Sequence, residues 1–183
     1  MAKKSERLLF VDVSRCLACK SCELACAVEH SASKDLVAAI KEEPRPTSRV
    51  KVEAAQEAAV PLQCRHCEDA PCVTICPTKA IEKLGLNQPV LIKDERCIGC
   101  KFCVMVCPFG VITLRGDGKV ALKCDLCLAR QEEGREPACV EACRTGALKF
   151  LTVDEITAKK RRSAAEALVE ASKGAKQAAE SKR

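Results

Sequence analysis

The chain has 183 residues and a formal net charge of +6 at pH 7, and 16 of its residues are cysteine. It contains no tryptophan, no tyrosine and only 4 phenylalanines, so it lacks the aromatic side chains on which single-stranded nucleic acids stack. No stretch approaches the roughly 18 consecutive apolar residues of a membrane span, and the N-terminus has no apolar signal region. We therefore expect a cytoplasmic protein whose thiols bind metal rather than form disulfides.

Between its cysteines the chain carries short apolar runs, which predict small strands. These strands are expected over residues 8–13, 60–62, 90–92 and 120–122. A second apolar segment follows three of the cysteine groups and ends at Ile81, Ile112 and Leu148. The repeating unit is strand, cysteine loop, one helical turn and strand, which predicts an α+β protein with little regular structure.

The first segment outside this repeat is an insert at residues 27–59. A helix is expected over residues 34–42, because its apolar residues fall on one side, and Pro44 and Pro46 end it. A strand is expected to follow over residues 49–53.

The second such segment is the C-terminal tail, residues 152–183. It starts with a capping-box pattern, with Thr152 and Glu155 at its two ends. A helix rich in alanine, lysine and glutamate is expected from there to about Ser172, with Gly174 as its stop. Its apolar stripe is thin, so we expect the helix to lie on another surface, either a catalytic partner or a second copy of this chain.

The sixteen cysteines fall into four groups of four. Group one is Cys16, Cys19, Cys22 and Cys26; group two is Cys64, Cys67, Cys72 and Cys76; group three is Cys97, Cys100, Cys103 and Cys107; group four is Cys124, Cys127, Cys139 and Cys143. Groups one and three have the spacing C-x2-C-x2-C-x3-C, group two opens to C-x2-C-x4-C-x3-C, and group four opens to C-x2-C-x11-C-x3-C. Every group begins with C-x2-C and ends with C-x3-C, so the chain contains an internal fourfold repeat.

This spacing is typical of loops that wrap a 4Fe-4S cluster, which takes four thiolates. Pro77 and Pro108 follow the last cysteine of groups two and three, as in bacterial ferredoxins, and Gly99 lets its loop turn N–H groups toward sulfur. Zinc is the alternative, but a zinc ribbon uses knuckles in twos with two ligands each. The sequence therefore predicts four 4Fe-4S clusters. With their thiolates they add about −8, so the formal positive charge is no evidence for nucleic acid binding.

The pairing of the groups follows from their separation. In two-cluster ferredoxins the fourth cysteine of each motif ligates the other cluster. Groups two and three are separated only by residues 77–96 and are expected to pair, which leaves groups one and four to pair with each other. The predicted ligand sets are Cys16, Cys19, Cys22 and Cys143 for cluster 1; Cys124, Cys127, Cys139 and Cys26 for cluster 2; Cys64, Cys67, Cys72 and Cys107 for cluster 3; and Cys97, Cys100, Cys103 and Cys76 for cluster 4.

This pairing predicts the domain organisation. A four-cluster domain is expected over residues 8–151, built from two ferredoxin-like halves with interleaved ligation. The outer half combines residues 8–26 with residues 119–151, and the inner half is residues 60–114.

Three stretches carry a resemblance to a known family: residues 16–30 (CLACKSCELACAVEH), 63–77 (QCRHCEDAPCVTICP) and 97–110 (CIGCKFCVMVCPFG). The chain resembles the four-cluster electron-transfer subunits of molybdopterin and related oxidoreductases. It is similar to the short forms that serve carbon monoxide dehydrogenase, formate dehydrogenase, hydrogenases, tungsten aldehyde oxidoreductases and tungsten benzoyl-CoA reductases. Ala27 and Arg144 stand where proline often follows the last cysteine, and neither departure removes a ligand.

The resemblance implies a subunit that relays single electrons between a catalytic subunit and another redox partner. A molybdenum or tungsten pterin enzyme is the favoured partner, ahead of carbon monoxide dehydrogenase or a hydrogenase. The alternative is a free polyferredoxin carrier, against which the insert and the capped tail argue weakly. The residues include no glycine-rich dinucleotide loop, no Ser–His–Asp set and no spare cysteine, so we expect no catalytic residues. His30 and His66 are not expected to bind metal, because the thiolates complete the ligand sets without them.

Overall fold

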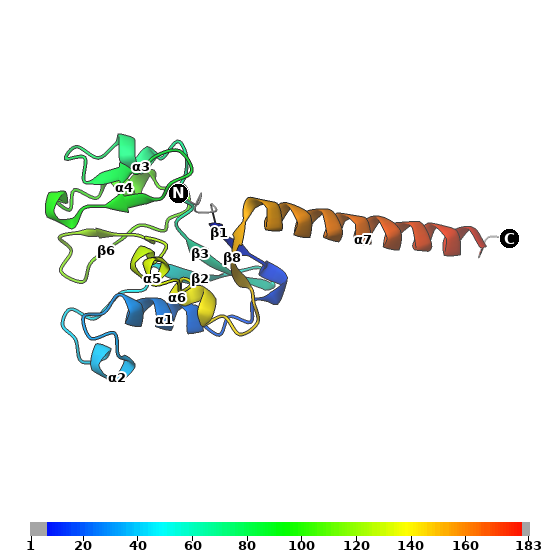
Figure 1. Ribbon diagram of the computed structural model, residues 1–183, viewed down its shortest axis with the longest axis horizontal. Coiled ribbons are helices and arrows are strands. Elements are labelled where there is room, and N and C mark those ends of the chain that lie inside the picture. Colours follow the sequence, from blue (N-terminus) through cyan, green and yellow to red (C-terminus); the bar gives the residue numbers. More distant parts are fainter. Residues whose placement is uncertain (1–6, 181–183) are drawn as a thin grey trace. The chain divides into compact units, whose positions relative to one another are not determined.

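The structure is a computed structural model that describes residues 7–180, with side chains described as far as residue 173 (Figure 1). The chain divides into two compact units. One is Leu9–Phe150, and the other combines the terminal segments Met1–Leu8 and Leu151–Arg183. Among the helices of the described part, none is both long and apolar enough to cross a membrane.

The regular elements are short, and strands precede and follow the cysteine loops. The strands are β1 (Arg7–Val11), β2 (Val50–Ala55), β3 (Ala58–Gln63), β4 (Ile81–Lys83), β5 (Val90–Ile92), β6 (Thr113–Leu114), β7 (Ala121–Leu122) and β8 (Leu148–Thr152). The helices are α1 (Ser21–Glu29), α2 (Leu36–Ala39), α3 (Pro71–Thr74), α4 (Phe102–Val106), α5 (Leu128–Glu132), α6 (Ala138–Glu141) and α7 (Val153–Glu180). The mixture of helix and sheet that the sequence predicts is confirmed, and every apolar run expected before a cysteine group contributes to a strand. The run that ends at Ile112 does not, because β6 begins at Thr113.

The strands form four two-stranded sheets, and their pairing follows the cysteine repeat. β4 pairs with β5 and β6 with β7, so the strand after one group pairs with the strand before the next. β8, after group four, pairs with β1, before group one. β3 pairs with β2 of the insert, with Val50 opposite Gln63. No strand directly follows group one, because its last cysteine lies inside α1. The insert supplies β2 in place of that strand.

The helix of the insert is shorter than predicted. α2 begins after Asp35, whose carboxylate accepts a backbone N–H of the first turn at 2.9 Å, and it ends at Ala39. The predicted end at residue 42 is wrong because Glu42 turns back toward the preceding loop. Its carboxylate accepts hydrogen bonds from the backbone N–H groups of Ala32 and Ser33, at 3.0 and 2.9 Å. These bonds hold residues 40–42 out of the helix.

The terminal unit contains the helix α7, which begins at the predicted capping box. The Glu155 carboxylate accepts the Thr152 N–H at 2.7 Å and the Thr152 hydroxyl at 3.0 Å, while the hydroxyl oxygen accepts the Glu155 N–H at 3.2 Å. These bonds hold the pKa of Glu155 below its ordinary value. The stop predicted at Gly174 is wrong, since α7 continues to Glu180. One glycine costs about 1 kcal/mol relative to alanine, and strong helix formers follow it.

The buried apolar side chains of Leu9–Phe150 form two separate clusters, and cysteines belong to both. The first comprises Cys22, Cys26, Val50, Val52, Cys139, Val140, Leu148 and Phe150. The second comprises Ala70, Cys72, Ile81, Val90, Cys103, Ile112 and Ala121. Groups one and four share the first cluster, and groups two and three share the second. Because thiols occupy these central positions, the packing of both clusters depends on what the thiols bind.

Candidate metal centres

The four cysteine loops share one backbone feature. The residue before the second cysteine is left-handed in every group, with φ of 55° at Ala18, 49° at His66, 65° at Gly99 and 59° at Leu126. No side chain would fit at Gly99, because a Cβ there would lie 2.6 Å from a backbone carbonyl oxygen. A left-handed residue in so short a loop turns neighbouring N–H groups to one side, where they can cradle an anionic group. The repeat of spacing is therefore also a repeat of conformation.

Backbone N–H groups in and around these loops point at cysteine sulfur. His66 N donates to Cys64 Sγ and Leu126 N donates to Cys124 Sγ, both at 3.4 Å. Three similar contacts of 3.3, 3.4 and 3.3 Å run from Arg49 N to Cys26, from Ala121 N to Cys97 and from Leu148 N to Cys143. Such bonds favour the thiolate over the thiol and tune a metal that the thiolate binds.

The thiols of group four lie close to Cys26 of group one. Cys26, Cys124, Cys127 and Cys139 are all buried. Burial raises the pKa of the Cys139 thiol, and the negative charges of Cys124, Cys26 and Cys127 raise it further. Cys26 and Cys139 also belong to the same buried cluster, so Cys26 packs with group four although it is far from it along the chain.

The thiols of group two line a cavity together with a cysteine of group three. The cavity is lined by Cys64, Cys67, Cys72 and Cys107, together with Arg65 and apolar side chains. Burial raises the pKa of Cys72, and the negative charges of Cys64 and Cys107 raise it further, while the positive charge of Lys123 lowers it. These four cysteines are one of the sets that the sequence predicts.

The structure brings the other two sets together in part. Burial raises the pKa of Cys22, and Cys143 is a charged neighbour that raises it further. Burial also raises the pKa of Cys103, with Cys97 and Cys100 as its charged neighbours. Of the remaining ligands, Cys76 packs against the second buried cluster, Cys16 packs against the first, and Cys19 is exposed.

The chemistry of these donors fits an iron–sulfur cluster. Burial raises the pKa of Cys22, Cys103 and Cys127 to about 11, so neighbouring thiols can ionise together only if a positive metal core compensates their charges. All-thiolate sets suit zinc or iron–sulfur centres, and N–H groups directed at sulfur help set the reduction potential of the latter. Beside group two, the Gln63 carboxamide and His66 Nε2 are buried and have no hydrogen-bond partner within the described residues, as expected beside a site for a bound group.

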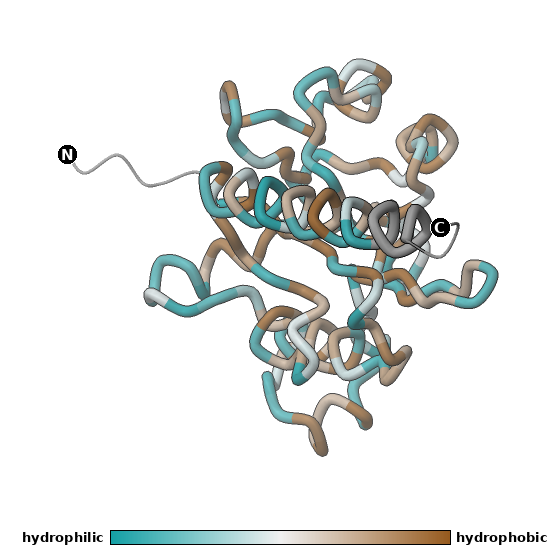
Figure 2. Tube along the Cα trace, turned by 90° about the vertical axis from the view of Figure 1, so that its right-hand side faces the viewer, coloured by the Kyte–Doolittle hydropathy of each residue, from teal (hydrophilic) through white to brown (hydrophobic). Residues whose placement is uncertain are grey.

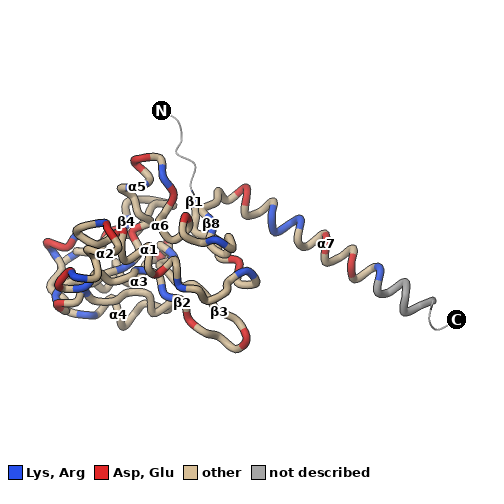
Figure 3. Tube along the Cα trace, turned by 90° about the horizontal axis from the view of Figure 1, so that it is seen from below, with Lys and Arg blue, Asp and Glu red and all other residues tan. Residues whose placement is uncertain are grey.

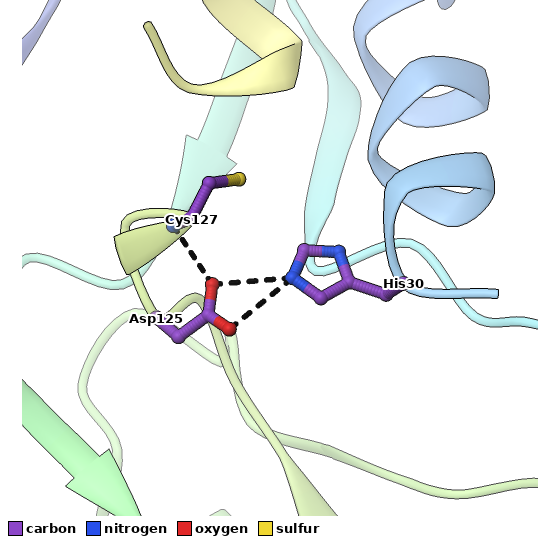
Figure 4. A group of neighbouring side chains, drawn as sticks. All are labelled: His30, Asp125 and Cys127. Atoms are coloured by element: carbon purple, nitrogen blue, oxygen red, sulfur yellow. Dashed lines mark hydrogen bonds and ion pairs between the residues drawn. The ribbon is translucent and has the colours of Figure 1, made fainter. Parts of the chain in front are cut away.

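Sequence reasoning missed an ion-pair site beside group four. Asp125 accepts the Cys127 N–H at 2.9 Å and pairs with His30 Nε2 at 3.2 Å (Figure 4) and with Arg49 Nη1 at 2.6 Å. Burial alone would lower the pKa of His30, but its hydrogen bonds to Asp125 and Cys26 raise it to about 9. One feature of the sequence could have indicated this site. Asp125 follows the first cysteine of group four, whereas leucine, arginine and isoleucine follow the first cysteine of the other groups.

The same three side chains offer donor atoms within 4.8 Å of one another, a spacing that a metal ion could also use. The ion pair, however, already satisfies His30 and Asp125. His30 therefore links α1 to the group-four loop, and the expectation that it is not needed as a ligand stays a prediction.

A buried lysine, Lys123, was also missed. Its ammonium donates to the backbone carbonyls of Val90 and Cys124, the latter at 2.9 Å. Burial lowers the pKa of His66 to about 3, and the charge of Lys123 contributes. His66 is therefore neutral, and its Nδ1 accepts the Val90 N–H at 3.0 Å. Its contact with cysteine sulfur comes from the backbone N–H rather than from the ring.

Comparisons with known proteins agree with this donor chemistry. The sequence profile of a family described as 4Fe-4S dicluster domain matches residues 55–153, and that of a 4Fe-4S binding domain matches residues 13–29. An iron-sulfur protein of Rhodospirillum rubrum is 44% identical over 163 residues, which cover 82% of this chain and 85% of that protein. Electron transport protein HydN of Escherichia coli (strain K12) is 37% identical over 178 residues, covering 87% and 97%. Thiosulfate reductase electron transfer subunit PhsB of Salmonella typhi is 38% identical over 162 residues, covering 82% and 78%.

Proposed function

Because the chain belongs to the 4Fe-4S dicluster family of electron-transfer proteins, we propose that it is the iron–sulfur subunit of an oxidoreductase and relays single electrons through four 4Fe-4S clusters. The observation that carries this proposal is the gathering of Cys26 with the thiols of group four. A fourth cysteine that crosses to the loop of another group is the ligation pattern of two-cluster ferredoxins.

We assign the clusters to the four ligand sets that the spacing predicts. One support is the cavity lined by Cys64, Cys67, Cys72 and Cys107. Another is that the negative charge of Cys143 raises the pKa of Cys22. In each case the fourth cysteine comes from the partner group.

The same pairing implies an outer half of residues 8–26 and 119–151 and an inner half of residues 60–114. Two observations support this division. The buried residues fall into two clusters, each with cysteines of only one pair of groups, and β8 pairs with β1 while β4 pairs with β5.

Different groups of the chain have different roles in the proposed relay. When bound, each cluster supplies one reversible one-electron step. Thiolates hold the clusters, backbone N–H groups favour negative charge on the sulfurs, and buried apolar side chains keep water away. All sixteen cysteines are used as ligands, so no coordination position is left for a substrate. The substrate chemistry then belongs to a partner.

We propose that this partner is the catalytic subunit of an oxidoreductase, with a molybdenum or tungsten pterin enzyme favoured. The relative PhsB is named as an electron transfer subunit of thiosulfate reductase, which supports a catalytic partner of this general kind. HydN is named only as an electron transport protein, so a carrier that is not permanently bound is the second candidate. Affinity purification of the native protein separates the two, because only a subunit retains stoichiometric catalytic protein.

Metal analysis tests the cluster count. We expect close to 16 iron atoms per chain after anaerobic purification, with as much acid-labile sulfide, because four complete ligand sets are present. Iron and zinc are measured on the same sample by mass spectrometry. An iron content near about 12 or about 8, or zinc in place of iron, contradicts the four-cluster proposal.

The tail offers a second surface for assembly. Along α7 up to residue 173, charged and hydrophobic positions are interspersed (Figures 2 and 3), and only Ile156 and Lys159 are half-buried. Leu168 and Val169 are 72% and 53% exposed. A helix with this exposed apolar strip is best stabilised by a protein surface, so we propose that it docks on the catalytic partner or on another copy of this chain.

Truncation after Leu151 tests this role. We expect cluster content to be unchanged, because every cysteine is retained, and the mass of the complex under native conditions to fall. Leu168→Lys, which removes apolar surface but leaves the helix intact, should weaken assembly in the same direction. If both variants assemble as the full chain does, α7 has no docking role.

A further inference from the structure

The two strictly spaced loops present the same exposed side-chain pattern. Group one exposes Leu17 (74%), Lys20 and Leu24 (54%), and group three exposes Ile98 (66%), Lys101 and Met105 (79%) at the corresponding positions. Groups two and four differ there. Arg65 stacks over the Phe109 ring, and Asp125 is held in its ion pair. Exposed apolar side chains around a lysine are therefore specific to the loops of groups one and three.

Only group one combines this pattern with an exposed thiol. All 16 cysteines lie in the described part of the chain, and among them Cys19 alone is exposed. Electron transfer weakens steeply with distance, so a carrier in solution exchanges electrons most readily where a ligand sulfur reaches the surface. Within the proposed relay, that place is the Cys19 loop.

Basic side chains without an ion-pair partner lie in this loop and next to Cys143. Arg15, Lys20, Arg144 and Lys149 make no ion pair with any residue that the structure describes. The side chains of Lys149 and Arg15 meet over Gly146, 3.4 and 3.6 Å from the position that a Cβ would take there. Gly146 N bonds to the carbonyl of Cys143, so this positive charge lies beside the ligand assigned to the same cluster as Cys19.

Two acids of this region form hydrogen bonds with groups other than these basic side chains. Glu23 points inward and accepts the Val52 N–H at 2.6 Å, and Asp12 is half-buried and accepts the Ser14 hydroxyl at 2.7 Å. Around group three, several basic side chains are paired. There the ion pairs are Lys93 and Arg96 with Glu82, and Arg115 with Asp94.

We propose that the group-one surface, defined by Arg15, Leu17, Cys19, Lys20, Leu24, Arg144 and Lys149, is the docking site of a small acidic one-electron carrier protein. The inference rests on the proposed relay function and names the partner for one end of it. An apolar centre with a charged rim is the usual form of a small interface, and unpaired positive charge steers an acidic partner onto it. The carrier's cofactor would meet the relay at Cys19.

The test compares two lysines in equivalent positions. Lys20 and Lys101 follow the second cysteine of their loops, and both are left-handed, with φ of 58° and 68°. Lys20→Glu and Lys101→Glu therefore carry the same backbone strain and the same change of charge. The probe is a small acidic ferredoxin, and the readout is its dissociation constant for the iron-loaded full chain at about 20 mM and about 300 mM salt.

We expect the unaltered protein to bind more weakly at the higher salt concentration. Lys20→Glu should raise the dissociation constant about fivefold or more at low salt and flatten the salt dependence, with Arg144→Glu acting in the same direction. Lys101→Glu should change it less than about twofold. Equal effects of the two lysine variants, a larger effect at Lys101, or binding without salt dependence would overturn the proposal.

Reduction of the same samples by dithionite tests the relay function separately from the docking site. If the iron content is complete and dithionite bleaches the clusters, but the acidic ferredoxin does not bind, the docking site is wrong and the relay stands. If the iron is missing, the relay itself is wrong.

Discussion

Replacing Cys26 with alanine is expected to remove the cluster of group four while the other thiols of its own loop keep theirs. Cys26 is 5% exposed, and its sulfur accepts the Arg49 N–H at 3.3 Å. Its charge raises the pKa values of Cys124, Cys127 and Cys139. The cluster that loses a ligand should therefore be the one assigned to these three cysteines. Iron content should fall by up to about 4 atoms, with a matching loss of absorbance and of electron paramagnetic resonance signal.

Double variants show which cluster is lost. If Cys26 and Cys127 serve one cluster, the variant with both replaced by alanine should lose no more clusters than either single variant. If Cys26 and Cys19 serve different clusters, their losses should add. Additive loss with Cys127, combined with no added loss with Cys19, would show that Cys26 ligates within its own loop and would contradict the crossed assignment.

The sequence predicted the repeat well because the repeat is local. Spacing alone marks the loops, and the left-handed residues at Ala18, His66, Gly99 and Leu126 follow from the need to wrap a loop of so few residues. Strands on either side were visible as apolar runs. The closing pair of β8 with β1 agrees with the pairing of groups one and four that the sequence predicts.

What could not be predicted lies in contacts between distant segments. Asp125 pairs with His30 and Arg49, which are 95 and 76 residues away along the chain, and no local pattern marks either of these two partners. Lys123 reads as an ordinary charged residue, yet it is 4% exposed. The end of α2 depended on the turn made by Glu42, and the length of α7 on the small cost of one glycine. Each of these outcomes was set by a balance of energies that spacing and periodicity do not report.

The largest effect on stability is expected at Arg130, which is also invisible in the sequence. Its side chain is 6% exposed, and its Nη1 pairs with Glu29 of α1 at 2.6 Å. Its Nη2 pairs with Glu141 of α6, and its Nε donates to the Glu136 carbonyl at 2.8 Å. Arg130 thus ties the long loop of group four to the helix that carries Cys26.

Arg130→Met should destabilise the protein by about 2–3 kcal/mol, because it removes the nearer of the two cations that pair with the largely buried Glu29 carboxylate and leaves only Lys34, at 3.5 Å. Clusters make unfolding irreversible, so the measured quantity is the rate of cluster bleaching in urea under anaerobic conditions, which should rise at least about tenfold. Arg135→Met is the matched control. Arg135 is 50% exposed and pairs with Glu133 at 3.4 Å, so its loss should cost no more than about 1 kcal/mol.

The destabilisation caused by Arg130→Met is expected to depend on pH. Burial alone would raise the pKa of Glu29, but Arg130 holds it below its ordinary value. The ion pair therefore stabilises the fold above the unfolded pKa of about 4.3, and that stability is lost as pH falls through the folded value. Without Arg130 the buried Glu29 carboxylate takes up a proton more readily, so the defect of Arg130→Met should be smaller at pH 5 than at pH 7.5. A defect that is equal at both pH values would show that Arg130 acts through packing alone. A defect no larger than that of Arg135→Met would show that the buried ion pair does not hold the group-four loop in place.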